Sequence, residues 1–96
     1  MQATSEIMNI EEARRIKDLI TEQTFDSHQF IRIMLKHNAA LYGEILVRYN
    51  DVTTADREIG KFLQNYSDDL DIIQIGSRES LNILNNNTPC ASWSKK

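Results

Sequence analysis

Hydrophobic residues recur at three- and four-residue spacing in the first two thirds of the chain, which is the period of amphipathic helices. The first such stretch spans residues 9–23, where Asn9 can cap a helix and Glu12, three residues later, can complete a capping box. Its apolar positions are Ile10, Ala13, Ile16, Leu19 and Ile20. The remaining positions are charged or polar, so we expect one face to pack and the other to be solvated.

A second helix is predicted after a break at residues 24–27, with Asp26 or Ser27 as its cap, and it runs without proline to about Asn50. Two apolar stripes follow it: Phe30, Met34, Leu41 and Ile45 on one side, and Ile31, Leu35, Tyr42, Leu46 and Tyr49 on the next. So wide an apolar arc exceeds what two further helices cover in a short chain. Leftover apolar patches usually mark interfaces, so we expect a homodimer or a complex with another protein, with Met34, Leu41 and Ile45 in the interface.

A third helix is predicted over residues 54–67, with Thr53 as its cap and Asp56 three residues later. Its buried side carries Ile59, Phe62, Leu63 and Tyr66. Its opposite side carries Arg57, Lys61 and Gln64 at positions i, i+4 and i+7, which share one helical face.

From Asp71 onward apolar residues alternate with polar ones, which indicates strands. We predict a short hairpin that pairs residues 71–75 with 80–84, a loop over 85–89, and a last short strand or turn at 90–93. Trp93 should dock against the core, because large aromatic residues near a terminus usually do so. The fold class is therefore mainly α with a small β-hairpin (α+β): three helices followed by a C-terminal hairpin, in winged-helix-like order.

Composition fits one globular domain. The chain has 96 residues, of which 41% are hydrophobic and 26% charged, so it can bury a core without disulfides. We expect a flexible N-terminal segment over residues 1–8 and a single domain over residues 9–96. The formal net charge of −3 supplies no whole-molecule attraction for nucleic acid or for an anionic membrane, although a local basic face can still bind phosphates.

Cysteine content and hydropathy bear on location. Cys90 is the only cysteine, which excludes an internal disulfide and fits a reducing compartment. The polar start has no basic segment followed by an apolar one, and no apolar stretch approaches the roughly 18 residues that span a bilayer. We expect a cytoplasmic protein without membrane contact.

Candidate chemistry is sparse along the sequence. His28 and His37 lie nine residues apart on one predicted helix, hence on opposite faces, and cannot share a metal ion. Cys90 has no neighbouring histidine or basic residue in the sequence to activate it, and the acidic cluster at residues 68–71 lacks the glycine and glutamate of a calcium loop. We therefore expect no catalytic, cofactor-binding or metal-binding residues, no small-molecule substrate and no enzymatic activity.

A small enzyme is a third and less favoured class, since an active site built from scattered residues leaves no sequence motif. Two other functions rank ahead of it. The leading hypothesis is a non-enzymatic interaction module that binds a protein partner or itself through the second helix. The alternative is a winged-helix-like DNA-binding protein, because a helix followed by a hairpin is the order in which that class places its recognition helix in the major groove. The residues for that role are Arg57, Lys61 and Gln64 on the helix and Arg78 in the hairpin.

The C-terminal residues Ser80-Leu81-Asn82-Ile83, then Pro89-Cys90-Ala91, then Trp93, resemble the ending of a group of small uncharacterised bacterial proteins. In that group a Ser-x-Asn-Ile-Phe-Gly stretch precedes a polar loop and a Cys-Ala-x-Trp ending. Residues 25–31 and 59–63 resemble its earlier blocks, so the resemblance covers about residues 25–95. Leu84 and Asn85 depart from the Phe-Gly pair. Small proteins of this kind are often carried on mobile DNA, including integron gene cassettes, and the resemblance implies such an origin without naming a function.

Overall fold

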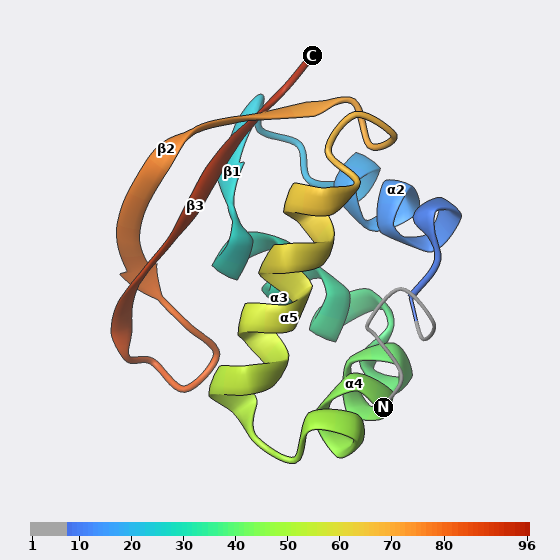
Figure 1. Cartoon of the computed structure of the whole chain (residues 1–96), viewed down its shortest axis with the longest axis vertical. Coiled ribbons are helices and arrows are strands. Elements are labelled where there is room, and N and C mark those ends of the chain that lie inside the picture. Colours follow the sequence, from blue (N-terminus) through green and yellow to red (C-terminus); the bar gives the residue numbers. More distant parts are fainter. Residues whose placement is uncertain (1–7) are drawn as a thin grey trace.

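The structure, a computed structural model, describes residues 8–96 (Figure 1). In this range the elements are helix α2 (Ile10–Leu19), strand β1 (Thr24–Asp26), helices α3 (Ser27–His37), α4 (Ala39–Tyr49) and α5 (Val52–Asn65), and strands β2 (Ile72–Leu81) and β3 (Asn87–Lys95). The described residues therefore form four helices and a three-stranded antiparallel sheet. The predicted α+β class, with helices before the C-terminal strands, is confirmed.

The strand order in the sheet is β1-β3-β2, so the C-terminal strand β3 is central. On one side it pairs with β1 through Phe25 opposite Trp93, and on the other with the whole of β2. A β-bulge between Gln74 and Gly76 shifts the register, and Gly76 has a φ of 145°, a conformation that disfavours any residue with a side chain. The long β2–β3 hairpin curves along the side of α5 (Figure 1).

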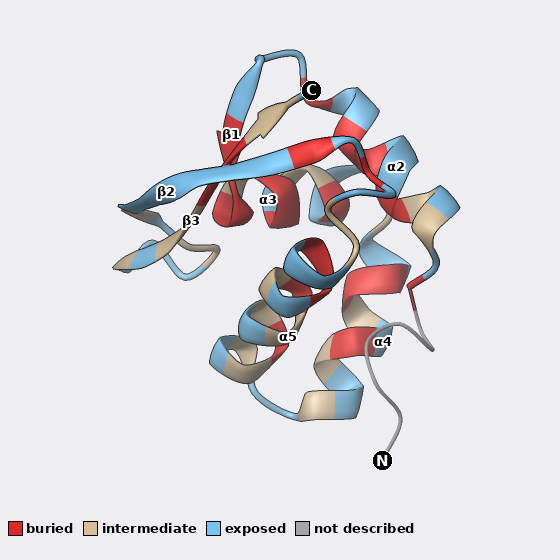
Figure 2. Ribbon diagram, turned by 45° about the horizontal axis from the view of Figure 1, so that its top comes forward, coloured by how far each residue is buried: buried red, intermediate tan, exposed pale blue. Residues whose placement is uncertain are grey.

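The buried hydrophobic side chains of all these elements form one cluster. Buried positions line the inward faces of the helices and the part of the sheet above them (Figure 2). The largest fully buried side chains include Trp93, Phe25 and Phe30. Met8 belongs to this cluster, so of the predicted flexible segment 1–8 its last residue is packed, while residues 1–7 lie outside the described range.

The residues predicted to form a protein interface lie in this core. Met34 and Ile45 are 0% exposed and Leu41 is 7% exposed. Their stripe is covered within the chain, because α3 contacts α2, α4, α5 and β3. The prediction that these three residues form an intermolecular contact is therefore wrong.

The second helix, predicted as one element to residue 50, is divided at Asn38. This residue has φ −151° and ψ 66°, outside the helical range, and its side-chain oxygen accepts a hydrogen bond from the Leu41 N–H of the next helix. The side-chain amide nitrogen of Asn38 donates to the carboxylate of Glu12 on α2 at 2.9 Å. At Asn38 the hydrogen bonds of one continuous helix are interrupted, and the side chain of Asn38 instead caps α4 and contacts α2.

The hairpin also differs from the prediction of 71–75 paired with 80–84. Residues 76–79, the predicted turn, lie inside β2, and the chain reverses instead over residues 82–86. There the Asn82 side chain accepts hydrogen bonds from the backbone N–H groups of Leu84 and Asn86, and Asn85 adopts a left-handed backbone with φ 62°. Both are familiar uses of asparagine in turns.

The other helix ends follow the sequence more closely. Asn9 caps α2 by accepting from the Glu12 N–H, as predicted, although α2 ends at Leu19 and not at residue 23. Asp26 caps α3, and Asp51, two residues before the predicted Thr53, caps α5. No helix among residues 8–96 is long and apolar enough to cross a membrane.

Candidate functional site

A cleft of about 470 Å³ separates α5 from the hairpin and the start of α3. Such a volume lies within the range of ligand-binding clefts. The cleft is lined by Ser27, His28, Ile31, Thr53, Asp56, Arg57, Gly60, Lys61, Gln64, Gln74, Asn82, Thr88, Pro89, Cys90, Ala91 and Trp93. One wall is therefore helical, the other is formed by the sheet, and most of the lining residues have polar side chains.

Three residues singled out in the sequence line the helical wall together: Arg57, Lys61 and Gln64, all exposed. Gly60 lies among them, and a Cβ added there would meet no other atom within 4 Å, so the middle of this wall is open. Lys61 contacts Glu58 at 3.0 Å, an exposed i, i+3 ion pair that holds it only weakly.

Arg78, the fourth residue of the predicted DNA-binding set, does not line the cleft. Its Nε donates to Asp26 Oδ2 at 2.9 Å, so the contact reaches from β2 over the central strand β3 to the end of β1. Its side chain is half-exposed while that of Asp26 is buried, so Arg78 acts first as the counter-ion of a buried carboxylate.

Asp56 contributes the one carboxylate among the residues that line the cleft. Burial raises its pKa above the ordinary value, although the Tyr42 hydroxyl donates a hydrogen bond to it at 2.8 Å and, with the nearby His28, favours its charged form. The same contact and burial raise the pKa of Tyr42. This carboxylate is therefore held in an environment that disfavours its charge.

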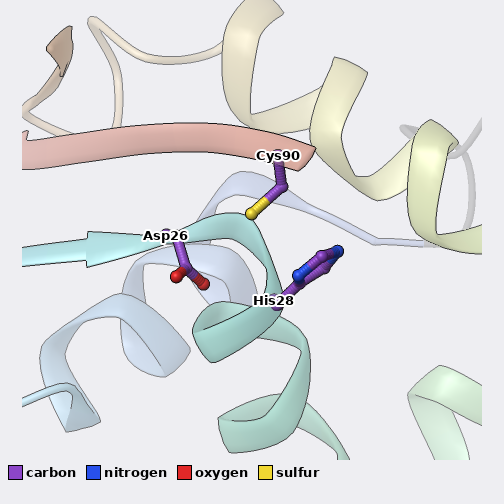
Figure 3. A group of neighbouring side chains, drawn as sticks. All are labelled: Asp26, His28 and Cys90. Atoms are coloured by element: carbon purple, nitrogen blue, oxygen red, sulfur yellow. The ribbon is translucent and has the colours of Figure 1, made fainter. Parts of the chain in front are cut away.

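A second group of polar side chains meets where the hairpin crosses the start of α3. His28 Nδ1 lies 2.7 Å from Ser80 Oγ, and Ser80 Oγ lies 3.5 Å from Cys90 Sγ. Thr88 Oγ1 lies 3.4 Å from the other ring nitrogen of His28. Figure 3 shows the Cys90 sulfur, a ring nitrogen of His28 and the carboxylate of Asp26 directed toward one another.

Asp26 completes this group. Burial would raise its pKa, but hydrogen bonds from the Gln29 backbone N–H, Arg78 and Ser80 outweigh burial and lower it. The carboxylate is therefore ionised at neutral pH even though the residue is buried.

No local sequence pattern signals this group, because Ser80 and His28 are 52 positions apart and the pairing of β3 with β1 and β2 brings Cys90 to them. The expectation that Cys90 has no histidine near it holds along the sequence and fails in space. His37 is exposed at the end of α3, and His28 is buried at its start.

Trp93 is 1% exposed, which confirms its predicted docking. Its indole Nε1–H donates to Ser27 Oγ at 3.0 Å, and the Ser27 hydroxyl in turn donates to the Ala91 carbonyl at 3.4 Å. This pair of contacts fixes β3 against the first turn of α3, beneath the cleft.

The site thus defines an α+β domain with a cleft between a helix and a hairpin. Comparison of the chain with protein-family models, with curated proteins and with solved structures gives no match. The resemblance of the C-terminal residues to small bacterial proteins stays an expectation. The geometry of the site is therefore the basis for any function.

Proposed function

We propose that this protein binds nucleic acid through the exposed face of α5 and the adjacent β2–β3 hairpin. One observation carries the proposal: Arg57, Lys61 and Gln64 line one wall of an open cleft whose other wall is the hairpin that follows α5 in the chain. Cationic and amide side chains at helical spacing suit contacts with phosphates and base edges.

The arrangement of α4 and α5 also supports this function. Two residues, Asn50 and Asp51, connect them, and Asn50 has a left-handed φ of 56° that turns the chain sharply. In helix-turn-helix proteins the second of two such helices enters the major groove with its N-terminal residues nearest the bases. In this chain that end of α5 carries Thr53 and Arg57.

The size of the cleft fixes how a duplex would approach. The major groove is about 12 Å wide and accepts a whole helix, whereas the cleft has the volume of a small ligand. We place α5 in the groove and one sugar-phosphate strand in the cleft between α5 and the hairpin. Because the net charge is −3, binding depends on these local cations and weakens steeply with salt.

Removing one cation from the cleft should weaken DNA binding and reduce its salt dependence. For Arg57→Ala we expect lower affinity for duplex DNA and a slope of log K against log salt that is smaller by about 1, because one fewer phosphate contact releases fewer counterions. Lys61→Ala should behave likewise. Fluorescence anisotropy with a labelled mixed-sequence duplex over a range of salt concentrations measures both quantities.

The matched control is Lys36→Ala, which removes one positive charge from an exposed position on α3 outside the cleft. It should leave the slope unchanged. An equal effect of Lys36→Ala and Arg57→Ala would mean that only net charge matters, and the absence of any binding by the unmodified protein at about 50 mM salt would refute the proposal.

A second candidate function, self-association, is favoured by a different surface. Strand β2 is an edge of the sheet, and it exposes Ile73, Ile75 and Leu81, each about half accessible. Long apolar edge strands are ready to pair with another strand, and two copies of the same edge can pair by two-fold symmetry. The occupant proposed here is a second copy of this chain, placed at β2 and not at the buried positions of α3 and α4.

Light scattering at micromolar concentration should then give twice the chain mass of 11.1 kDa. Ile75→Lys should return the protein to a monomer, because it places a charge in the pairing edge. Val47→Lys is the matched control, since Val47 on α4 is 82% exposed and lies outside the sheet. A monomeric mass for the unmodified protein, or equal behaviour of the two variants, would exclude the β2 interface.

A further inference from the structure

Three metal-ligating side chains converge where the hairpin meets α3. They come from three elements: Asp26 ends β1, His28 lies in the first turn of α3, and Cys90 lies on β3. One ligand atom from each, a carboxylate oxygen, a ring nitrogen and the sulfur, all lie within 4.8 Å of one another (Figure 3). Asp26 and His28 are buried and Cys90 is half-buried, which distinguishes the group from an exposed acidic cluster.

The three donors share one hydrogen-bonding partner, the Ser80 hydroxyl. It lies 2.7 Å from His28 Nδ1 and 3.5 Å from Cys90 Sγ, and it donates to the Asp26 carboxylate. A single hydroxyl group at the centre of a carboxylate, an imidazole and a thiol occupies the position in which these groups would hold a cation.

We infer that Asp26, His28 and Cys90 form a binding site for a thiophilic divalent transition ion of the Zn²⁺ class. The donor set carries the chemical assignment, because thiolate and imidazole ligands select zinc and its neighbours, whereas Ca²⁺ and Mg²⁺ take oxygen ligands. Binding replaces the proton of the Cys90 thiol by the metal ion and releases that proton to solvent.

The geometry requires only small movements. Zinc bonds to sulfur at about 2.3 Å and to nitrogen or oxygen at about 2.0–2.2 Å, so tetrahedral ligand atoms lie about 3.6 Å apart. Atoms now within 4.8 Å must approach by at most about 1.2 Å, and the Ser80 side chain must rotate away.

Outer contacts for the ligands are in place. If Nδ1 of His28 binds the ion, its other nitrogen can donate to Thr88 Oγ1, 3.4 Å away. Asp26 is oriented by the Gln29 N–H and by Arg78. His28 and Cys90 both line the cleft, which gives the ion a route of entry and leaves a coordination position open to water.

A bound ion would fasten the hairpin to the start of α3. Because Cys90 lies on the wall of the cleft that faces Arg57 and Lys61, the ion would also fix the width of that cleft. The metal site does not depend on nucleic-acid binding, and its test uses the protein without DNA.

The test is a titration of the full, reduced, chelator-treated protein with Co²⁺, which takes the place of Zn²⁺ and is visible in absorption. We expect one ion per chain, a near-ultraviolet thiolate-to-cobalt charge-transfer band, visible bands of tetrahedral intensity, and loss of all of them when Zn²⁺ is added. Cys90→Ser should abolish the charge-transfer band and His28→Gln should reduce affinity at least tenfold. His37→Gln, at an exposed histidine outside the cleft, should change nothing.

The Ser80→Ala variant distinguishes two hypotheses for this group: a metal-binding site and a purely structural cluster of hydrogen bonds. It removes the hydroxyl that competes for the three donors, so it should bind Zn²⁺ at least as tightly as the unmodified protein does. In the unmodified protein, whose one cysteine is Cys90, Zn²⁺ should slow alkylation of the thiol by iodoacetamide, a readout that needs no variant. An alkylation rate unchanged by Zn²⁺, or equal Co²⁺ spectra for Cys90→Ser and the unmodified protein, would overturn the site and leave Ser80 as the hub of a purely structural junction.

Discussion

At the scale of single residues, Asp56 is a carboxyl group in the lining of the cleft whose surroundings disfavour its ionised form. Burial and the repelling charge of Asp51 raise its pKa. The hydrogen bond from Tyr42 and the nearby His28 lower it, but the net shift is upward. The folded state therefore holds its proton to higher pH than the unfolded state does. Stability from this group is present at low pH and is lost as pH rises from the unfolded value of 3.8 through the raised folded value.

Replacing Asp56 by Asn should remove this pH dependence. Asparagine keeps an oxygen to accept from the Tyr42 hydroxyl and carries no charge. Relative to the unmodified protein, Asp56→Asn should gain stability as pH rises from about 3.8 to 7. The gain follows the negative charge that the unmodified protein acquires at this buried position and the asparagine variant does not. Urea denaturation at several pH values measures it.

Asp51→Asn is the control with the opposite sign. Hydrogen bonds from the Thr54 backbone and hydroxyl, which outweigh desolvation, lower the pKa of Asp51, so the unmodified protein gains stability from Asp51 as pH rises from the lowered folded value to the unfolded value of 3.8. Asp51→Asn should therefore lose stability relative to the unmodified protein as pH rises to about 3.8, below the range in which Asp56→Asn gains it. An Asp56→Asn variant whose stability runs parallel to that of the unmodified protein from about pH 3.8 to 7 would show that Asp56 is not held in a charge-disfavouring environment.

How much of the site could be predicted depends on the sequence distance between its residues. Arg57, Lys61 and Gln64 share a face because helical spacing alone puts them there, and the structure brings them to one wall. His28 and Cys90 meet only because β3 pairs with both β1 and β2, and no local pattern encodes that pairing. Sequence reasoning therefore found the helical half of the cleft and missed the half built by the sheet.

At the scale of elements, the helices were easier to predict than the strands. The 3.6-residue period identified α2 and α5 and the combined length of α3 and α4, since burial of one face requires that period. It did not reveal the break at Asn38, because apolar spacing continues through both helices and the break depends on a contact with Glu12 from another element. Asparagine within a predicted helix was the available signal, given its preference for caps.

The hairpin shows the same limit more strongly. Strand residues have a period of two, so a displaced turn leaves the alternating pattern intact and changes every partner. The glycine at position 76 suggested a turn, whereas in the structure it is part of a bulge, and the asparagine-rich stretch forms the actual turn. Pairing with the central strand β3 decides between the two, and that pairing is long-range.

At the scale of the whole molecule, the C-terminal strand β3 joins the two strands that flank the helices α3, α4 and α5. β3 pairs with β1, which follows the first described helix, and with β2, which follows the last. The backbone N–H of Lys95 donates to the Gln23 carbonyl at 3.0 Å, so the ladder extends one step beyond β1. The hairpin wall of the cleft is thus held by a strand whose own position rests on Trp93.

Trp93→Ala should therefore destabilise the entire domain and not only its end. The indole is fully buried, and removing so large a side chain leaves a cavity and takes away the N–H that donates to the Ser27 hydroxyl, at an expected cost of about 3 kcal/mol. That is a large part of the stability of a domain of this size. Urea denaturation followed by circular dichroism should show an earlier and still cooperative transition for this variant.

Trp93→Phe is the matched control, because it keeps an aromatic ring in the core and loses the hydrogen bond from the indole Nε1–H to Ser27. It should cost less than the alanine variant, by roughly the cavity contribution. Since Trp93 is the one tryptophan in the chain, its fluorescence reports the same packing directly. Emission should be blue-shifted in the native protein and move to the red in denaturant; a fully solvated spectrum under native conditions, or an unchanged melting temperature after truncation at Asn87, would contradict the role of β3 as the strand that holds the sheet to the helices.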